Sequence, residues 1–222
     1  MENINELSVL TPQGKQDIRR MLGIDDEGGE GKSSLKYIID GSNKSIIEGN
    51  IENNISSGIY SHSEGDHTTA SGVASHAEGY ETSAGDVASH AEGHATSASV
   101  YSHAEGDRTT ASGVASHAEG VNTLASGNQS HAEGYGTIAK NSTQHVFGAF
   151  NIQDPSSANI GTHGTYIEIV GNGTASMYRS NARTLDWDGN ERLKGSLTLG
   201  AGLSDEVTIT AAQLKQLLAL LN

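Results

Sequence analysis

Small and polar residues alternate in the central part of the chain, from Ser61 onward, in a pattern with a 14-residue period. The block S-H-A-E-G, or the variant S-H-S-E-G, begins at Ser61, Ser75, Ser89, Ser102, Ser116 and Ser130, and the step from Ser89 to Ser102 is one residue shorter than the others. A Thr and an Ala follow each block, which gives the consensus S-H-A-E-G-x-x-T-x-A-S-G-x-x. Such an internal repeat predicts a solenoid in which each repeat forms one coil and stacks on the next.

Each repeat is predicted to form two short β-strands joined by two tight turns, because a unit of this length is too short for a helix pair. Glycines occupy the expected turns, where positive φ angles favour them. The first turn has Gly65, Gly79, Gly93, Gly106, Gly120 and Gly134, and the second has Gly72, Gly85, Gly113 and Gly127. The short step is expected to shorten the second turn at Ala98–Tyr101, since a turn loses a residue more easily than a strand.

The alternation of side chains along a strand assigns the two faces of each coil. Ser and Ala of the block share one face, and His and Glu share the other. Ser, Ala and the Thr-x-Ala positions are small enough to fill a narrow roll, so the His and Glu side chains are predicted to point outward. Stacking at about 4.8 Å places them in two adjacent columns. The columns are His62, His76, His90, His103, His117 and His131, and Glu64, Glu78, Glu92, Glu105, Glu119 and Glu133.

The sequence leaves several interpretations open for these two columns. The favoured one is a ladder of hydrogen bonds and partial ion pairs at a trimer axis, because a motif in every coil suits a repeated contact better than one active site. A metal-ligand array, a catalytic His/Glu pair and plain solvent exposure are the alternatives. Pairing would raise the pKa of the histidines and lower that of the glutamates, whereas burial of the imidazoles would lower the histidine pKa. The favoured interpretation predicts no catalytic residue, no metal and no cofactor.

Degenerate copies of the repeat flank the array, at Ser45–Gly49 and Gln144–Gly148, and are predicted to cap it. Five segments follow from these boundaries: a helical attachment segment, a linker, the roll, a small β-rich module, and a terminal strand with an oligomerisation helix. Their ranges are 1–24, 25–44, 45–148, 149–203 and 204–222. Strands in the β-rich module are expected at 165–170, 175–178, 184–187 and 193–199, between Gly-Asn-Gly and Asp-Gly-Asn turn signals.

The terminal helix is predicted to be amphipathic. Thr210 followed by Gln213 forms a capping box at its start. One face of the helix carries Leu214, Leu217, Leu218 and Leu221. A helix of about 12 residues is marginal in water by itself, so this face is expected to contribute to the trimer interface together with the His and Glu columns.

Composition supports a thin oligomeric rod. Only 34% of the 222 residues are hydrophobic, 28 are glycine and none is cysteine. The net charge of −14 repels phosphate backbones and anionic lipid, so nucleic-acid binding is not expected. The acidic start and the lack of an apolar run of about 20 residues predict no membrane insertion. The stretch from Asp186 to Asn190 has the composition of a calcium loop, but a polar β-turn is favoured, and His67, His94 and His163 are expected at the surface.

The repeats resemble the head repeats of trimeric adhesins of the YadA-like class, in which S-V-A-I-G takes the place of S-H-A-E-G. The resemblance covers about residues 45–148 and implies an all-β, left-handed parallel β-roll that packs as a homotrimer. It also implies that the His and Glu positions face the trimer interface, where the family has Val and Ile. By this resemblance, a trimer interface that is apolar in the family would be polar in this chain.

Two later segments are similar to phage proteins. Ile169–Thr174, Arg179–Ala182 and Thr184–Asn190 look like the segment that follows S-H-A-E-G arrays in structural proteins of phages and prophages of Firmicutes. Val207–Leu221 is similar to the closing segment of phage head-fibre proteins. Trimeric adhesins carry a secretion signal and a membrane anchor, and neither is expected here.

The resulting hypothesis is a non-enzymatic homotrimeric fibre on the head or tail of a bacteriophage particle, made in the host cytoplasm and carried on the virion surface. It would serve as a stiff spacer, with another virion protein bound at one terminus and a host surface glycan or protein at the other. A bacterial adhesin fragment is the first alternative, and a fibre-borne glycan hydrolase is the second.

Overall fold

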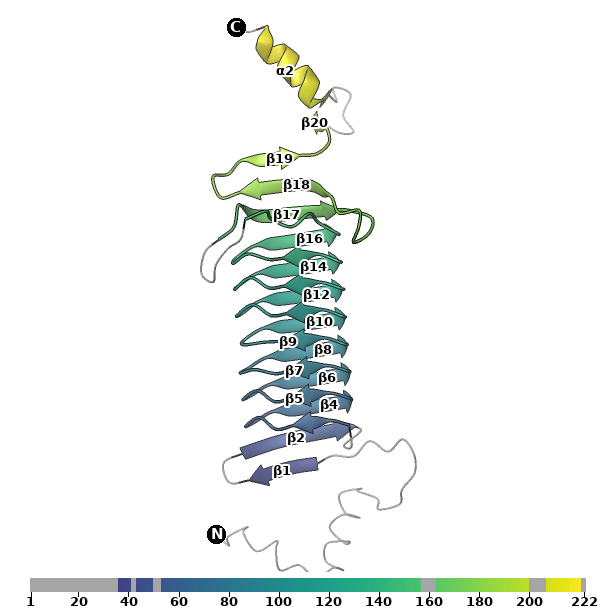
Figure 1. Ribbon diagram of the computed structural model, residues 1–222, viewed down its shortest axis with the longest axis vertical. Helices are drawn as coiled ribbons and strands as arrows, with labels where there is room; N and C mark the ends of the chain where they lie inside the picture. Colours follow the sequence, from purple (N-terminus) through teal and green to yellow (C-terminus); the bar gives the residue numbers. More distant parts are fainter. Residues whose placement is uncertain (1–35, 41–42, 50–52, 157–162, 200–206, 221–222) are drawn as a thin grey trace, which may run out of the picture.

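A computed structural model describes residues 36–40, 43–49, 53–156, 163–199 and 207–220. Its coils stack along one long axis, with β1 near one end and α2 at the other (Figure 1). The helix predicted within residues 1–24 and the side chains of Leu217, Leu218 and Leu221 lie outside the described part of the structure.

Each coil gives one five-residue strand to a long sheet and one two-residue strand to a short sheet. The long-sheet strands are β4 (His62–Asp66), β6 (His76–Tyr80), β8 (His90–His94), β10 (His103–Asp107), β12 (His117–Val121), β14 (His131–Tyr135) and β16 (His145–Ala149). The short-sheet strands are β3 (Ile55–Ser56), β5 (Thr69–Ala70), β7 (Ser83–Ala84), β9 (Ser97–Ala98), β11 (Thr110–Ala111), β13 (Leu124–Ala125) and β15 (Ile138–Ala139). Neighbouring coils pair in parallel and in register, as in His76↔His90 and Ala84↔Ala98. The predicted parallel β-solenoid, with one coil for each repeat, is confirmed.

The interior between the two sheets is filled by small side chains. Alanines of the long sheet, such as Ala77 and Ala104, face alanines of the short sheet, such as Ala84 and Ala111, and all of these are 0% exposed. The consensus Ser and Thr are buried beside them. The predicted inward face is therefore confirmed. The consensus Ser also closes its own turn, since Ser116 Oγ donates to the carbonyl of Gly113 at 2.7 Å.

The glycines of the two turns have different roles. First-turn glycines have positive φ, as predicted, for example +108° at Gly106. The expectation for the second turn is wrong, because there the positive φ is carried by non-glycine residues such as Ala115. Gly113 is required by close stacking instead, since a Cβ added to it would lie 2.0 Å from the carbonyl oxygen of Gly127.

The short step between Ser89 and Ser102 shortens the second turn, as predicted. Strands on both sides of it keep full register, with His90↔His103 and Ala98↔Ala111. Asp86 takes the place of Gly72 in the next coil, just before the short turn, and it is exposed.

Antiparallel strands cover both ends of the long sheet. At the first end, β2 (Asn43–Gly49) stacks in parallel on β4, and β1 (Lys36–Asp40), within the segment expected as linker, pairs antiparallel with β2. At the other end, β17 (Tyr166–Asn172) stacks in parallel on β16, and β18 (Asn181–Asp186) and β19 (Glu191–Leu193) follow antiparallel. The strand expected at 175–178 is a tight turn with one bridge, Ala175↔Tyr178. β1 and β19 are therefore the edge strands of the long sheet.

Asparagine side chains satisfy the ends of the short sheet. Asn151 accepts from the amide of Ile138 at 2.8 Å and donates to its carbonyl at 3.1 Å, as a further strand would. At the opposite end, Asn54 in the coil of β3 accepts from the amide of Thr68 in the next coil at 3.0 Å, and Ser45 Oγ donates to the carbonyl of Ser56 in β3 at 3.0 Å. Both asparagines are buried. These side chains end the short sheet without leaving its buried backbone groups unpaired.

The end of the chain contains a two-stranded sheet and a short helix. β20 (Leu197–Leu199) pairs antiparallel with β21 (Val207–Ile209), and α2 (Ala211–Ala219) follows. The predicted capping box is confirmed, because the amide of Gln213 donates to Thr210 Oγ1 at 3.2 Å and the amide of Thr210 donates to Gln213 Oε1 at 2.9 Å. Among the described residues, no helix has the length and apolar character needed to cross a membrane.

Candidate functional site

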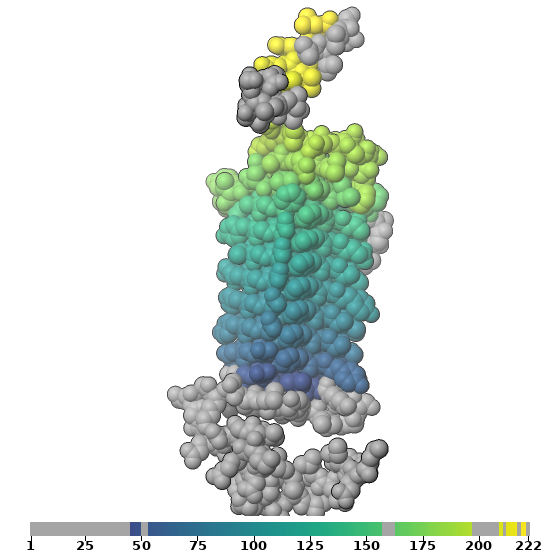
Figure 2. Space-filling view, turned by 180° about the vertical axis from the view of Figure 1, so that it is seen from behind, coloured from purple at the N-terminus to yellow at the C-terminus, as the bar shows by residue number. Residues whose placement is uncertain are grey.

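The His and Glu columns form on the outer surface of the long sheet, which we call the His/Glu face. Adjacent imidazole rings stack with centroids 4.6–4.9 Å apart, and their planes differ by at most 20°. The predicted outward direction of these side chains is confirmed by their partial exposure. The regular stacking of the coils is visible on the molecular surface in Figure 2.

Both columns extend by one residue beyond the perfect repeats. His145 extends the histidine column, because its ring stacks on that of His131 with a centroid distance of 4.9 Å. Glu48 extends the glutamate column, and its Oε2 atom lies 3.9 Å from His62 Nε2. The degenerate repeats at Ser45–Gly49 and Gln144–Gly148 contain both residues, so a looser consensus would have found them. Phe147 takes the Glu position beside His145, at a ring distance of 5.2 Å.

Histidine and glutamate approach each other without forming hydrogen bonds. The Nε2 atoms of His76 and His90 lie 3.6 Å from the carboxylate of the same coil, Glu78 and Glu92. The remaining pairs join a histidine to the carboxylate of the preceding coil at 3.8–3.9 Å: His62–Glu48, His117–Glu105, His131–Glu119 and His145–Glu133. These distances exceed those of N–H···O bonds. The expected hydrogen-bond ladder is therefore not formed within one chain.

The Nε2 atoms of all seven stacked histidines are buried and have no hydrogen-bond partner among the residues of the chain that the structure describes. Burial and the neighbouring imidazoles lower the pKa of His76, His103 and His131, against a smaller raising effect of nearby glutamates. The expectation that pairing raises the histidine pKa is wrong for these three residues, and the alternative, dominance of burial, holds. Burial therefore favours the neutral state of these three imidazoles, which lie beside the column of carboxylates.

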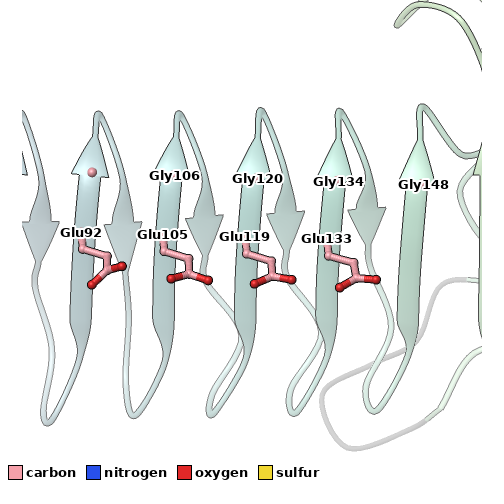
Figure 3. A pocket seen from close by; sticks show the side chains of 9 residues that line it. Glu92, Glu105, Gly106, Glu119, Gly120, Glu133, Gly134 and Gly148 are labelled. Carbon is pink, nitrogen blue, oxygen red and sulfur yellow. The ribbon is translucent and has the colours of Figure 1, made fainter.

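A shallow groove runs along the glutamate column. Its volume is about 710 Å³, and it is lined by glutamates and glycines of five successive coils. Figure 3 shows the side chains of Glu92, Glu105, Glu119 and Glu133 extending in the same direction from adjacent strands. The glycines that follow them leave the floor of the groove without side chains. Another polypeptide can therefore approach the backbone closely at this place.

The calcium-loop alternative does not fit the geometry at Asp186. Its carboxylate accepts from the amides of Asp188 and Asn190, at 3.1 and 2.8 Å. Hydrogen bonds from Asn190 lower the pKa of Asp186, and Gly189 completes the turn with a φ of +82°. The favoured polar β-turn is confirmed.

The three histidines outside the motif lie at the surface, as expected. His67 and His94 have half-exposed side chains. The imidazole of His94 lies 2.6 Å from the Asp107 carboxylate, and His163 contacts Trp187 at a ring distance of 4.5 Å. None of the three belongs to the stacked column.

Comparison with known families relates the repeats to a class of surface proteins. The family described as YadA head domain repeat matches in two overlapping copies, at residues 104–130 and 118–139. No curated protein and no solved structure matches the chain significantly. The family match and the parallel solenoid together support a YadA-like β-roll.

Proposed function

We propose that the protein is the shaft of a homotrimeric surface fibre, in which the His/Glu face of each chain packs against the same face of two other copies. The observation that carries this proposal is the row of seven buried Nε2 atoms without a partner. Buried polar groups are normally hydrogen-bonded, so a second surface with matching groups is expected over this face.

A second copy of the chain fits this face because its groups repeat at the same spacing. Each coil presents one His and one Glu, and rings of successive coils are 4.6–4.9 Å apart. An identical roll aligned in parallel presents its own groups at that same spacing over the full length. The glycine floor of the groove admits the side chains of a neighbouring roll. YadA-like head domains form homotrimers, which favours threefold symmetry.

The role of the trimer is mechanical. The His and Glu of this face recur in every coil, whereas a catalytic site would need such a pair only once. A continuous parallel sheet along the long axis gives a stiff spacer that holds its two ends apart. The terminal leucines Leu214, Leu217, Leu218 and Leu221 are proposed to join the three chains at the end of the shaft.

The particular fibre we propose is that of a bacteriophage virion, on the head or the tail, with one terminus bound to the particle and the other directed to the host surface. Its support is the resemblance of Ile169–Thr174 and Thr184–Asn190 to phage structural proteins. A bacterial surface adhesin is the second candidate, favoured by the match to the YadA head repeat. Antibodies against the roll, applied to purified particles and to intact cells of the source, distinguish them: labelled particles support the virion fibre, and labelled cells support the adhesin.

Crosslinking tests which face lies at the interface. The chain has no cysteine, so His103→Cys introduces a single thiol on the His/Glu face, and Thr110→Cys introduces one on the outer side of the short sheet. A short trifunctional maleimide should convert His103→Cys into covalent trimers and leave Thr110→Cys mostly monomeric on denaturing gels. The reverse pattern would assign the interface to the short sheet.

A further inference from the structure

The His/Glu face contains four clusters in which two stacked histidines and one glutamate converge. In each cluster, one ligand atom per residue lies within 4.8 Å of the other two. The clusters are His62, Glu64 and His76; His76, Glu78 and His90; His90, Glu92 and His103; and His117, Glu119 and His131.

The polar atoms that converge in each cluster are not joined by hydrogen bonds through the histidine Nε2 atoms. Each carboxylate can only accept hydrogen bonds, and each histidine Nε2 is buried without a partner. Two imidazoles and a carboxylate are a ligand set suited to Zn²⁺ and similar transition-metal ions rather than to Mg²⁺ or Ca²⁺.

We propose that these clusters are transition-metal sites, each holding one ion of the Zn²⁺ class through two histidine Nε2 atoms from successive coils and one glutamate oxygen. Zinc binds nitrogen and oxygen at about 2.0–2.2 Å, so the ligand atoms must come closer together than they are in the free chain. The side chains are about one-third exposed, and rotation about their side-chain bonds brings them together. Water completes the coordination as the fourth ligand.

Shared histidines limit how many of the sites can be filled at once. His76 belongs to the first and second clusters, and His90 belongs to the second and third. The largest set without a shared ligand consists of the clusters centred on Glu64, Glu92 and Glu119. The array therefore takes three ions per chain.

The metal sites use the same Nε2 atoms on which the trimer proposed above rests, but all ligands of a cluster come from one chain, so the zinc stoichiometry is measured separately from the oligomeric state. A threefold ring of histidines is a different arrangement with a different stoichiometry. In such a ring, one ion is shared by three chains, whereas a cluster within one chain gives one ion to every chain. The number of ions lost on removing one histidine separates the two arrangements.

The test is zinc stoichiometry on the full chain. Protein stripped with a chelator is dialysed against Zn²⁺ at pH 7.5 in an excess of Mg²⁺, and bound zinc is measured by elemental analysis. We expect three Zn²⁺ per chain. Displacement of the zinc by Mg²⁺ would overturn the proposal, because it would mean that the carboxylates alone attract the ion.

Two triple variants locate the bound zinc. His76→Gln/His90→Gln/His117→Gln removes a ligand from all four clusters, and zinc binding should be lost. The matched control His67→Gln/His94→Gln/His163→Gln removes the three histidines outside the column and should keep three ions per chain. Equal zinc content in both variants would overturn the proposal.

If the variant His76→Gln/His90→Gln/His117→Gln fails to fold, a single substitution still tests the proposal. His117→Gln alone should reduce the zinc content from three ions to two per chain, with unchanged circular dichroism. A reduction of only one ion per three chains would indicate a threefold ring and contradict the single-chain clusters. No reduction would contradict both arrangements.

Discussion

At the scale of single residues, the width of the roll is set by alanine. Ala104 of β10 and Ala111 of β11 are both fully buried between the sheets. Interiors of this density tolerate little added volume. In the coil that starts at Ser61, Ser63 takes the place of the consensus alanine, and its hydroxyl lies 2.5 Å from Thr68 Oγ1. In the coil of Ala104, the equivalent atom Thr109 Oγ1 is buried and has no hydrogen-bond partner among the described residues.

Substitution at Ala104 tests this assignment. Ala104→Leu should overpack the interior and lower the free energy of unfolding by about 1–3 kcal/mol per chain. The matched variant Ala104→Ser should be neutral or stabilising, because its hydroxyl can pair with Thr109 as Ser63 pairs with Thr68. Denaturant melts measure both effects. A leucine tolerated as well as serine would show that the interior is assigned to the wrong face.

Glycine in the second turn provides a second prediction. Gly113→Ala should lower the free energy of unfolding by at least about 3 kcal/mol, because its Cβ would meet the carbonyl of Gly127 at 2.0 Å. Gly85→Ala is the control, since a Cβ there meets nothing within 4 Å. Thermal melts of the two variants should differ widely. Similar melting temperatures would contradict the close stacking of the coils.

At the scale of elements, the histidine column acts as one unit. Seven imidazoles stand 4.6–4.9 Å apart, so a proton on one ring disfavours a proton on the next. This coupling adds to desolvation and lowers the pKa of His76, His103 and His131. The neutral imidazoles stabilise the fold above the unfolded histidine pKa of about 6.5. That contribution is lost as pH falls through the lower folded values.

Acidification should therefore destabilise the roll. The melting temperature of the wild-type chain is expected to fall between pH 7.5 and pH 5, a range above the ordinary glutamate pKa of about 4.3. His76→Gln/His103→Gln/His131→Gln should show a flatter profile, while His67→Gln/His94→Gln/His163→Gln should keep the wild-type slope. Identical profiles in all three proteins would show that the stacked histidines do not control the pH response.

The terminal helix gives a prediction at the same scale. In the single chain, Leu214 is 47% exposed, and Leu217 and Leu218 share its predicted face. Leu217→Asp/Leu218→Asp should weaken assembly, because charges buried in a small bundle lack partners. Leu220→Asp is the control, since Leu220 is 84% exposed and lies off that face. Sedimentation velocity measures assembly. Equal effects of the two variants would remove the helix from the interface.

At the scale of the whole molecule, the repeat determined most of what the sequence could predict. Coil length, both faces, the shortened turn and the capping box follow from local spacing and side-chain size. The partners of His and Glu did not follow, because coil-to-coil offsets decide whether His117 meets Glu105 or Glu119, and burial decides the protonation state. The role of Gly113 was also missed, since close contact between coils leaves no signal in a single turn.

A single roll, taken as a whole, leaves polar groups unpaired and buries little apolar surface. One chain leaves seven Nε2 atoms buried without partners beside a row of carboxylates. The interior consists largely of alanine, serine and threonine, so one chain buries little apolar surface. Association through the His/Glu face offers partners to the histidines and adds buried surface. The trimer is thus the central claim of this account.

The measurement that tests this claim most directly is the mass of the full chain in solution, by light scattering or sedimentation equilibrium at pH 7.5. We expect a single species of three times 23.1 kDa that keeps its mass on dilution to low micromolar concentration. A stable, folded species of 23.1 kDa with the β-rich circular dichroism of the roll would contradict it.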